Sequence, residues 1–539
     1  MYIETAEEPL SHPNVVTPGV RSEIQEYTVT QRRRRKVLPR AALVGLCAGL
    51  TGSLFRITLA SADSLRNSFI AWTQQFPAFG WIFPVLFSVV GAVVSLALVR
   101  RFAPDAKGSG IPHLKAVEYR FRTMHWQRIL PVKFISGILA IGSGLALGRE
   151  GPTVQLGGAV GDAVSDWLRV PPRERRTLIA AGAGAGLAAA FNAPLSGLTF
   201  VLEEVQRDFH PIVFAATFIA SVIADIIARA LTGSMPVFSI PNYPAMALDT
   251  LPLFVVLGVA AGLTGVLFNR GVVGTLNLFA RYSQNSRLRA AGIVGALVGL
   301  VGWFSPVAIG GGHTLAESAL AGHLLISTIP IWFALRFLLT IFSYGTGTAG
   351  GIFAPLLVLG ALVGLAVGQI GQSLAPTVIT HPGVFAVVGM AAYFTAVVRA
   401  PLTGILLIVE MTGSYEQMLP LLVSCFCSYA VAEMLKSLPI YEELLERDLA
   451  GSDSGTSLKE PMVIDLTIES GALFDGRQVR DLGLPPGCVL VRILEDGREI
   501  VPKATTRLEA YMKITAVIAP EAADSLEMLR TGCKASQPA

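Results

Sequence analysis

The stretch from Gly142 to Gly161, GSGLALGREGPTVQLGGAVG, is the most informative part of the sequence. It is apolar and rich in glycine, yet Arg149 and Glu150 lie at its centre. Pro152 begins a run without charge, and proline suits the first position of a helix. Glu150 is therefore expected just before, or in the first turn of, a helix that starts inside an apolar chain. Helix N-termini attract anions, and an ionisable residue at such a place in a membrane protein is a candidate functional residue.

The composition predicts a polytopic membrane protein. Of 539 residues, 52% are hydrophobic and 15% are charged, and the mean hydropathy is +0.58. Apolar stretches of spanning length recur from about residue 41 to about residue 438, which is too apolar for one soluble domain. We therefore expect a multi-pass protein of the cell membrane, the inner or plasma membrane, in contact with lipid.

The basic run from Arg32 to Lys36 precedes the first apolar segment. By the positive-inside rule it predicts that both termini are cytoplasmic. No aromatic residues interleave with these charges, so a nucleic-acid partner is not expected. The five cysteines show no pairing pattern, and we expect no disulfide, no metal and no cofactor.

The membrane segment contains an internal duplication. Gly142–Gly161 aligns with Gly345–Gly364, GTGTAGGIFAPLLVLGALVG, with nine identities in twenty positions at an offset of 203 residues. Two further blocks, Pro104–Gly110 and Ala180–Gly197, recur in the same order at nearly the same offset. Duplicated halves with Gly- and Pro-interrupted apolar segments are typical of secondary transporters, in which broken helices from both halves meet at one site. The pattern leaves open whether the halves are parallel or inverted.

The two halves differ in their chemistry. Where the first half has Arg149 and Glu150, the second has Ile352 and Phe353. This difference favours one asymmetric site between the halves over two equivalent sites.

These observations predict a domain order. It comprises an N-terminal arm over 1–40, a membrane domain over 41–445 with halves at about 41–235 and 248–445, a linker over 446–461, a soluble α+β domain over 462–530 and a tail over 531–539. In the soluble domain we expect strands near Met462–Glu469, Cys488–Leu494 and Met512–Ala519, a hairpin turn at Glu495-Asp-Gly-Arg498, and a final helix within 520–531.

Three motifs carry a family resemblance: Gly108-Ser-Gly-Ile-Pro112, Gly148-Arg-Glu-Gly-Pro152 and Gly351-Ile-Phe-Ala-Pro355. In this order they resemble the anion-binding sequences of the CLC family of chloride channels and chloride/proton antiporters. The resemblance covers roughly residues 40–445 and implies an all-α, inverted-repeat membrane subunit, assembled as a homodimer with one ion pathway per subunit. The positions that form the motif backbone are Gly108, Gly110, Pro112, Gly148, Arg149, Gly151, Pro152, Gly351 and Pro355.

The resemblance also implies roles for side chains. Chloride contacts fall on Ser109, Ile352, Phe353 and Tyr441. Glu150 is identified as the gate and external proton carrier, because its carboxylate when ionised repels chloride or occupies its place.

Glu204 matches the family's internal proton glutamate. From the residues alone, Glu203 and Glu204 are equally well explained as solvated groups at a helix end.

The leading hypothesis is therefore chloride/proton antiport, with chloride and protons as the transported ions. A passive, gated chloride channel on the same fold is the alternative. An enzyme is not expected, because the apolar segments contain no HExxH, no GxSxG and no paired catalytic aspartates.

The C-terminal segment Leu482-Gly-Leu-Pro-Pro-Gly487, with the strand and turn that follow it, resembles the TrkA-C type of regulatory domain. It departs from that pattern at Glu509-Ala-Tyr-Met512, where a Gly-Asp pair usually precedes the last strand. A regulatory ligand of this domain is expected, and its identity is unknown.

Overall fold

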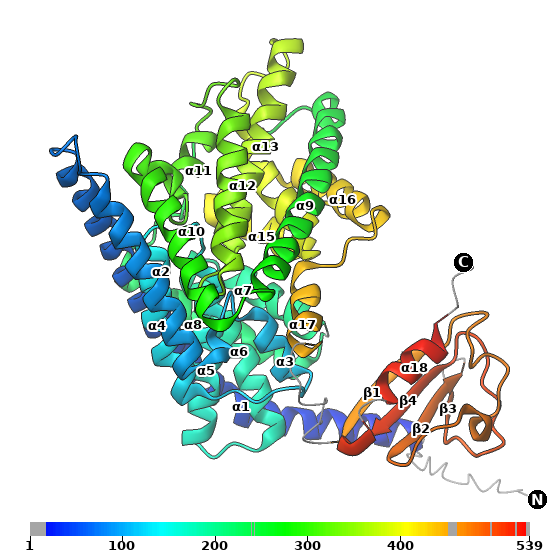
Figure 1. The fold of residues 1–539 in the computed structure, drawn as a ribbon. Helices are drawn as coiled ribbons and strands as arrows, with labels where there is room; N and C mark the ends of the chain where they lie inside the picture. The colour runs from blue at the N-terminus through cyan, green and yellow to red at the C-terminus, as the bar shows by residue number, and fades with distance from the viewer. Residues whose placement is uncertain are drawn as a thin grey trace, which may run out of the picture.

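The computed structural model describes residues 18–450 and 461–534, apart from positions 208, 239, 242, 496, 497, 523 and 524. A large helical domain is followed by a small domain of strands and one helix (Figure 1). The first half of the helical domain contains α1 (Pro18–Thr73), α2 (Ile82–Phe102), η1 (Pro104–Ala106), α3 (Ile111–Glu118), α4 (Trp126–Gly142), α5 (Glu150–Trp167), α6 (Pro172–Phe191), α7 (Pro194–Phe200), the π-helical η2 (Val201–Gln206) and α8 (Pro211–Thr232).

The second half repeats this series of elements. It contains η3 (Leu248–Thr250), α9 (Leu251–Ala280), α10 (Gln284–Phe304), η4 (Pro306–Ala308), α11 (His313–Leu320), α12 (Ile329–Gly345), α13 (Phe353–Leu374), α14 (Gly383–Val398), α15 (Pro401–Thr412), α16 (Met418–Met434) and α17 (Ile440–Ala450).

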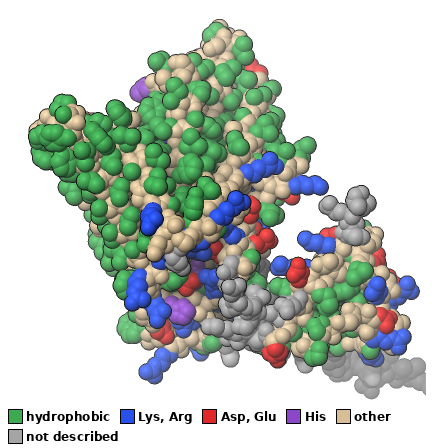
Figure 2. Space-filling model, viewed as in Figure 1, with side chains coloured by type: hydrophobic (Ala, Val, Ile, Leu, Met, Phe, Trp, Pro, Cys, Tyr) green, Lys and Arg blue, Asp and Glu red, His purple; other side chains and the backbone are tan. Residues whose placement is uncertain are grey.

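The helical domain is a membrane domain. Within the described residues, six helical segments are long and apolar enough to cross a membrane: Arg35–Thr73, Ile82–Phe102, Pro211–Thr232, Leu248–Ala280, Asn285–Phe304 and Phe353–Leu374. Hydrophobic side chains cover the body of this domain, whereas charged side chains gather at its lower end and on the small domain (Figure 2). Four further apolar helices, α12 and α14–α16, are shorter, with 10–17 residues each.

The halves are inverted with respect to each other, and two repeat-related glutamates show it. Glu203 accepts hydrogen bonds from the amides of Leu402 (3.1 Å) and Thr403 (2.8 Å) at the start of α15. Glu410, the equivalent residue of α15, accepts hydrogen bonds from the first amides of α7, with Ser196 N at 2.8 Å. The continuous segment of α7 and η2 thus caps the N-terminus of α15, and α15 caps the N-terminus of α7, which requires α7 and α15 to run antiparallel. The predicted all-α inverted repeat is confirmed.

The N-terminal arm predicted over 1–40 is helical from Pro18 onward, and its bounds stay a prediction. Helix α1 begins at Pro18 and continues without interruption to Thr73, although Pro39 lies inside it. The run Arg32–Lys36 consists of long, unbranched basic side chains, which favour a helix as much as a solvated arm. Residues 1–17 of the expected arm lie outside the described residues.

The small domain is a four-stranded antiparallel sheet in the order β1-β4-β2-β3, with α18 (Ser525–Cys533) as its helix. Its strands are β1 (Met462–Thr467), β2 (Cys488–Glu495), β3 (Arg498–Ile500) and β4 (Lys513–Ile518); it also contains the short helices η5 (Val479–Leu482) and η6 (Pro520–Ala522). The three predicted strands and the final helix are present. The edge strand β3 was not predicted as a strand, because three residues are too few for an alternation pattern.

The hairpin between β2 and β3 pairs Glu495 with Arg498, and the two residues between them lie outside the described part. The departure from the TrkA-C pattern has a structural consequence at Tyr511. Its φ of 70° lies in the left-handed region, which glycine adopts without strain. Of the expected linker over 446–461, residues up to Ala450 belong to α17 and residues 451–460 lie outside the described part.

Candidate ion-binding site

The three sequence motifs meet at one point between the halves. Gly148 and Gly351 exchange two backbone hydrogen bonds, of 2.7 and 2.8 Å. Gly108 donates to the carbonyl of Thr348 at 3.1 Å and accepts from the amide of Gly350 at 2.9 Å. These short bridges tie motif loops from both halves into one backbone cluster.

Three helices begin at this cluster: α3 at Ile111, α5 at Glu150 and α13 at Phe353. The amides of a helix's first turn have no carbonyl partner within the helix and carry partial positive charge. Pro112, Pro152 and Pro355 lie within the first three helical positions, where a missing N–H costs nothing. The cluster is therefore suited to an anion.

Glycine is required where the motifs touch. Gly110 has a φ of 83°, and a Cβ there would lie 2.7 Å from the Cβ of Gln155. A Cβ on Gly151 would lie 2.7 Å from the Cβ of Ser109 and 3.0 Å from its Cα. Side chains at these positions would force the motif loops apart.

Two buried cationic side chains donate to backbone carbonyls of the loops before α3 and α11, and neither was predicted from the sequence. Lys133 is fully buried and donates to the carbonyls of Ala106 (2.9 Å) and Gly108 (2.7 Å). Arg336, its counterpart in the second half, is also fully buried and donates to the carbonyl of Ala308 at 2.9 Å. Their sequence signal was a single charge at equivalent places of two apolar segments.

Glu150 belongs to the first half, and its side chain contacts the second half. Its side chain is buried, and Oε2 accepts a hydrogen bond of 3.2 Å from the amide of Ala354 in the first turn of α13. The guanidinium of Arg149 lies nearby, with 3.9 Å between Nε and Oε1. The carboxylate thus occupies a helix N-terminus where an anion would also be stabilised.

The four residues predicted to contact chloride are all buried: Ser109, Ile352, Phe353 and Tyr441. The Ser109 hydroxyl accepts a hydrogen bond of 3.3 Å from the amide of Ile111. Within the described residues the buried hydroxyl of Tyr441 has no hydrogen-bond partner. Tyr441 lies close enough to Glu150 and Glu204 for their charges to act on it. The structure brings these residues together, and their role in binding chloride stays a prediction.

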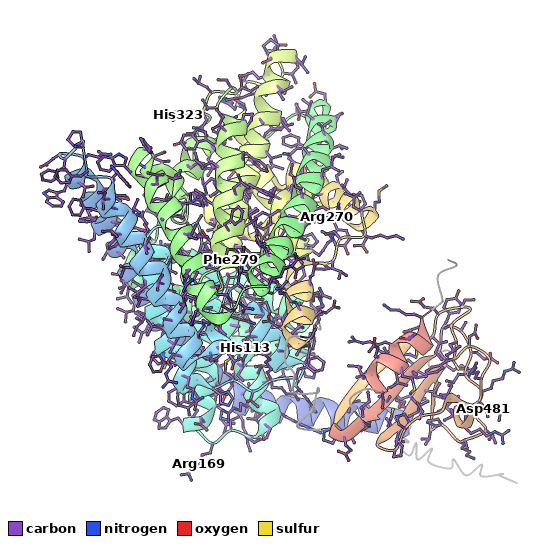
Figure 3. The ribbon with its side chains drawn as sticks, viewed as in Figure 1. His113, Arg169, Arg270, Phe279, His323 and Asp481 are labelled. Atoms are coloured by element: carbon purple, nitrogen blue, oxygen red, sulfur yellow. The ribbon has the colours of Figure 1, made fainter. Side chains whose placement is uncertain are left out.

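A cavity lies on each side of the cluster. The first, of about 180 Å³, is lined by Glu150, Arg149 and His313 among others. The second, of about 150 Å³, reaches Gly108 and Gly110 from the opposite side and also touches His113 and Phe279, both labelled in Figure 3.

The two ends of the membrane domain are marked by labelled residues in Figure 3. His323 lies at one end, and Arg169 at the other. We call the end near Arg169, from which α1 and α17 lead toward the small domain, the terminal face.

The two neighbouring glutamates, Glu203 and Glu204, have different environments, and neither is a solvated helix-end residue. Glu203 caps α15, as described above. Glu204 is 1% exposed, and its Oε1 accepts a hydrogen bond of 2.7 Å from the fully buried Lys115. Lys115 also donates to Glu442 in the first turn of α17, a contact that the sequence analysis did not predict. These contacts place Glu204 in a buried ion-pair cluster toward the terminal face.

A membrane domain of two inverted halves, whose broken helices direct their N-termini at one buried site, defines the class of secondary ion transporters and their channel relatives. Residues 90–433 match the family described as voltage gated chloride channel, and residues 463–530 match the TrkA-C domain. The chain belongs to the voltage-gated chloride channel (CLC) family, with a TrkA-C domain at its C-terminus.

Similar proteins include curated relatives and solved structures. The chain is 42% identical to the H⁺/Cl⁻ exchange transporter ClcA of Vibrio parahaemolyticus over 419 residues, 77% of this chain and 90% of that protein. It is 39% identical to the transporter of the same name from Cronobacter sakazakii, over 78% of this chain and 91% of that one.

Among solved structures, a slow cyanobacterial Cl⁻/H⁺ antiporter matches with a TM-score of 0.74 and 37% identity, covering 77% of this chain and 99% of that chain. A eukaryotic CLC transporter shares the fold with a TM-score of 0.66 at 20% identity, over 94% of this chain and 91% of that chain.

Proposed function

We propose that this protein exchanges chloride for protons across the cell membrane, with Glu150 as gate and external proton carrier. The observation that carries the proposal is the position of the Glu150 carboxylate on the first turn of α13, next to Ile352 and Phe353. A carboxylate and a chloride ion compete for that place when Glu150 is ionised. Protonation removes the negative charge that holds Glu150 there, so one residue couples the two ions.

Four groups would bind the chloride: the hydroxyls of Ser109 and Tyr441 and the amides of Ile352 and Phe353. A chloride that leaves water needs several donors and no fixed negative charge close by. The buried hydroxyl of Tyr441, without a partner in the described part of the chain, fits this requirement. The names of the relatives, exchange transporter and antiporter, support exchange over a passive channel.

Glu204 is the inner proton carrier in this proposal. It is buried on the side of the site that faces the terminal face, whereas Glu150 borders the cavity on the other side. We assign the terminal face to the cytoplasm, because the basic residues at 32–36 precede the first span on that side. A carboxylate on each side of the chloride site provides a relay for protons.

A homodimer belongs to the same proposal. The neighbouring helices α7, α15 and α16 carry exposed apolar side chains that a second subunit could cover. These are Leu195, Leu402, Leu419, Leu422 and Phe426. The TrkA-C domain acts in regulation through a ligand that is still to be identified. Both assignments are supported by the family to which the chain belongs.

The test is chloride-driven proton uptake in vesicles that contain the full chain. Wild type should take up protons when chloride leaves, and Glu150→Ala should pass chloride without dependence on a pH gradient. Glu204→Gln should lose most proton movement and retain some chloride flux. Chloride flux without any proton uptake in wild type would make the protein a channel. Coupled uptake that persists in Glu150→Ala would remove Glu150 from the mechanism.

A further inference from the structure

Glu204 is joined to the terminal face by a second carboxylate. Lys115 donates to Oε1 of both Glu204 and Glu442, and Arg207 lies 2.8 Å from the same oxygen of Glu442. These groups come from three elements, α3, η2 with the residue that follows it, and α17. Tyr119 and Tyr441 are further titratable groups close enough to respond to these charges.

Each carboxylate keeps one oxygen free. Within the described residues, Oε2 of Glu204 and Oε2 of Glu442 are buried and have no hydrogen-bond partner. A buried polar atom without a partner is costly, and native structures usually satisfy it with protein or water. A carboxylate oxygen that neither donates nor accepts within the protein is free to take a proton.

Exposure changes along the cluster. The Glu204 side chain is 1% exposed, Lys115 is fully buried, and the Glu442 side chain is 19% exposed. Arg207, at 43%, lies on the solvent side of Glu442. Of the two carboxylates, Glu442 is therefore the one nearer to the solvent at the terminal face.

We propose that Glu442 is the entrance carboxylate of the inner proton route, and that Lys115 passes the proton from Glu442 to Glu204. The inference rests on the proposed exchange of chloride for protons and on Glu204 as its inner carrier. It adds a proton donor that the family motifs do not contain, on the residue that directly follows Tyr441.

The step balances without any further reactant. Solvent protonates Glu442; the Lys115 ammonium then gives a proton to Glu204, so an N–H bond breaks and an O–H bond forms. The O–H bond of Glu442 breaks and restores the N–H of Lys115. One proton has moved from Glu442 to Glu204, Lys115 has its original charge, and reversal of the steps releases a proton to the terminal face.

The experiment compares the ratio of protons to chloride for Glu442→Gln, its neighbour Glu443→Gln and wild type, all as full chains in vesicles. Gln keeps the shape of Glu and cannot carry the proton. Glu442→Gln should lower the proton rate by about a hundredfold or more, the size typical for loss of a proton-transfer group. Chloride flux should fall less, so that the ratio drops. Glu443→Gln and Glu442→Asp should both keep the wild-type ratio.

If Glu442→Gln does not fold, the isosteric pair Glu442→Asp and Glu442→Asn gives the same comparison. A variant that loses proton and chloride flux in equal proportion, with the ratio unchanged, overturns the proposal and leaves Glu442 a structural ion-pair partner. Loss of coupling in Glu118→Gln, with coupling kept in Glu442→Gln, would also overturn the proposal. In the wild-type protein the Glu118 carboxylate accepts a hydrogen bond of 3.0 Å from Gln206. If Glu204→Gln abolishes coupling while Glu442→Gln does not, this inference alone fails.

Discussion

Gly151 is the residue at which one added methyl group should stop transport. A Cβ there would lie 2.7 Å from the Cβ of Ser109, well inside ordinary contact. Gly151→Ala should therefore displace the first motif from the second and reduce chloride flux by about tenfold or more, as displaced reacting groups do in enzymes.

The control is Gly274→Ala in α9, where an added Cβ would meet no described atom within 4 Å apart from its chain neighbours and the backbone of its own helix. That variant should transport like wild type. Equal flux in both variants, measured as chloride efflux from vesicles, would mean that the contact between the motifs does not determine the site.

Tyr441 offers a second test at the scale of one atom. Its buried hydroxyl has no partner within the described residues, so Tyr441→Phe removes no hydrogen bond inside the protein. A hydrogen bond to an ion contributes about 1.5–3 kcal/mol, so chloride affinity should fall by roughly tenfold to a hundredfold.

Titration calorimetry of the purified protein measures this change. Tyr393→Phe is the matched control, because its hydroxyl donates to the carbonyl of Thr264 at 3.2 Å and lies outside the predicted site. A chloride affinity that is the same in Tyr441→Phe and wild type would remove Tyr441 from the binding site.

At the scale of elements, α7 and α15 are held together by their reciprocal caps. The Glu203 carboxylate accepts from two amides and from the Thr403 hydroxyl at 2.8 Å. Loss of a cap costs about 1 kcal/mol, so Glu203→Ala and Glu410→Ala should each lower the thermal unfolding temperature by a few degrees.

The same variants separate Glu203 from its neighbour. The ratio of protons to chloride should not change in Glu203→Ala, whereas Glu204→Gln should lower it. Glu317→Ala on α11, whose side chain is 42% exposed, is the control for unfolding. An unfolding temperature of Glu203→Ala equal to that control would contradict the capping role.

The sequence predicted the elements of the site better than their contacts. Gly and Pro positions are local signals, so the helix starts near Ile111, Glu150 and Phe353 could be predicted, as could the internal duplication. The contact of Lys115 with Glu442 joins positions 327 residues apart, and the cap of Glu203 on Leu402 joins positions 199 apart. No local pattern encodes such pairs, because each depends on how the two halves pack.

At the scale of the whole molecule, the small domain contacts the membrane domain next to the proton route. Phe121, just after α3, packs against the core of the small domain, and Arg120 donates to the carbonyl of Pro461 at 2.9 Å. Helix α3 begins beside Ser109 and carries Lys115. A shift of the small domain can therefore reach the chloride site and the proton route through one short helix.

This arrangement makes a prediction about a chain that ends at Ala450. All three motifs and the three proposed proton glutamates precede that residue, so the shortened chain should fold, dimerise and transport chloride. Its transport rate should differ from that of the full chain, because the contact at Phe121 is lost.

Phe121→Ser in the full chain should reproduce the rate of the shortened chain, whereas Val501→Ser, at an exposed position of the small domain, should not. A shortened chain that folds and dimerises but moves no chloride would make the small domain part of the transport machinery itself. A Phe121→Ser variant with the wild-type rate would mean that the domain acts through another route, of which α17, the helix leading from Tyr441 toward the domain, is the next to test.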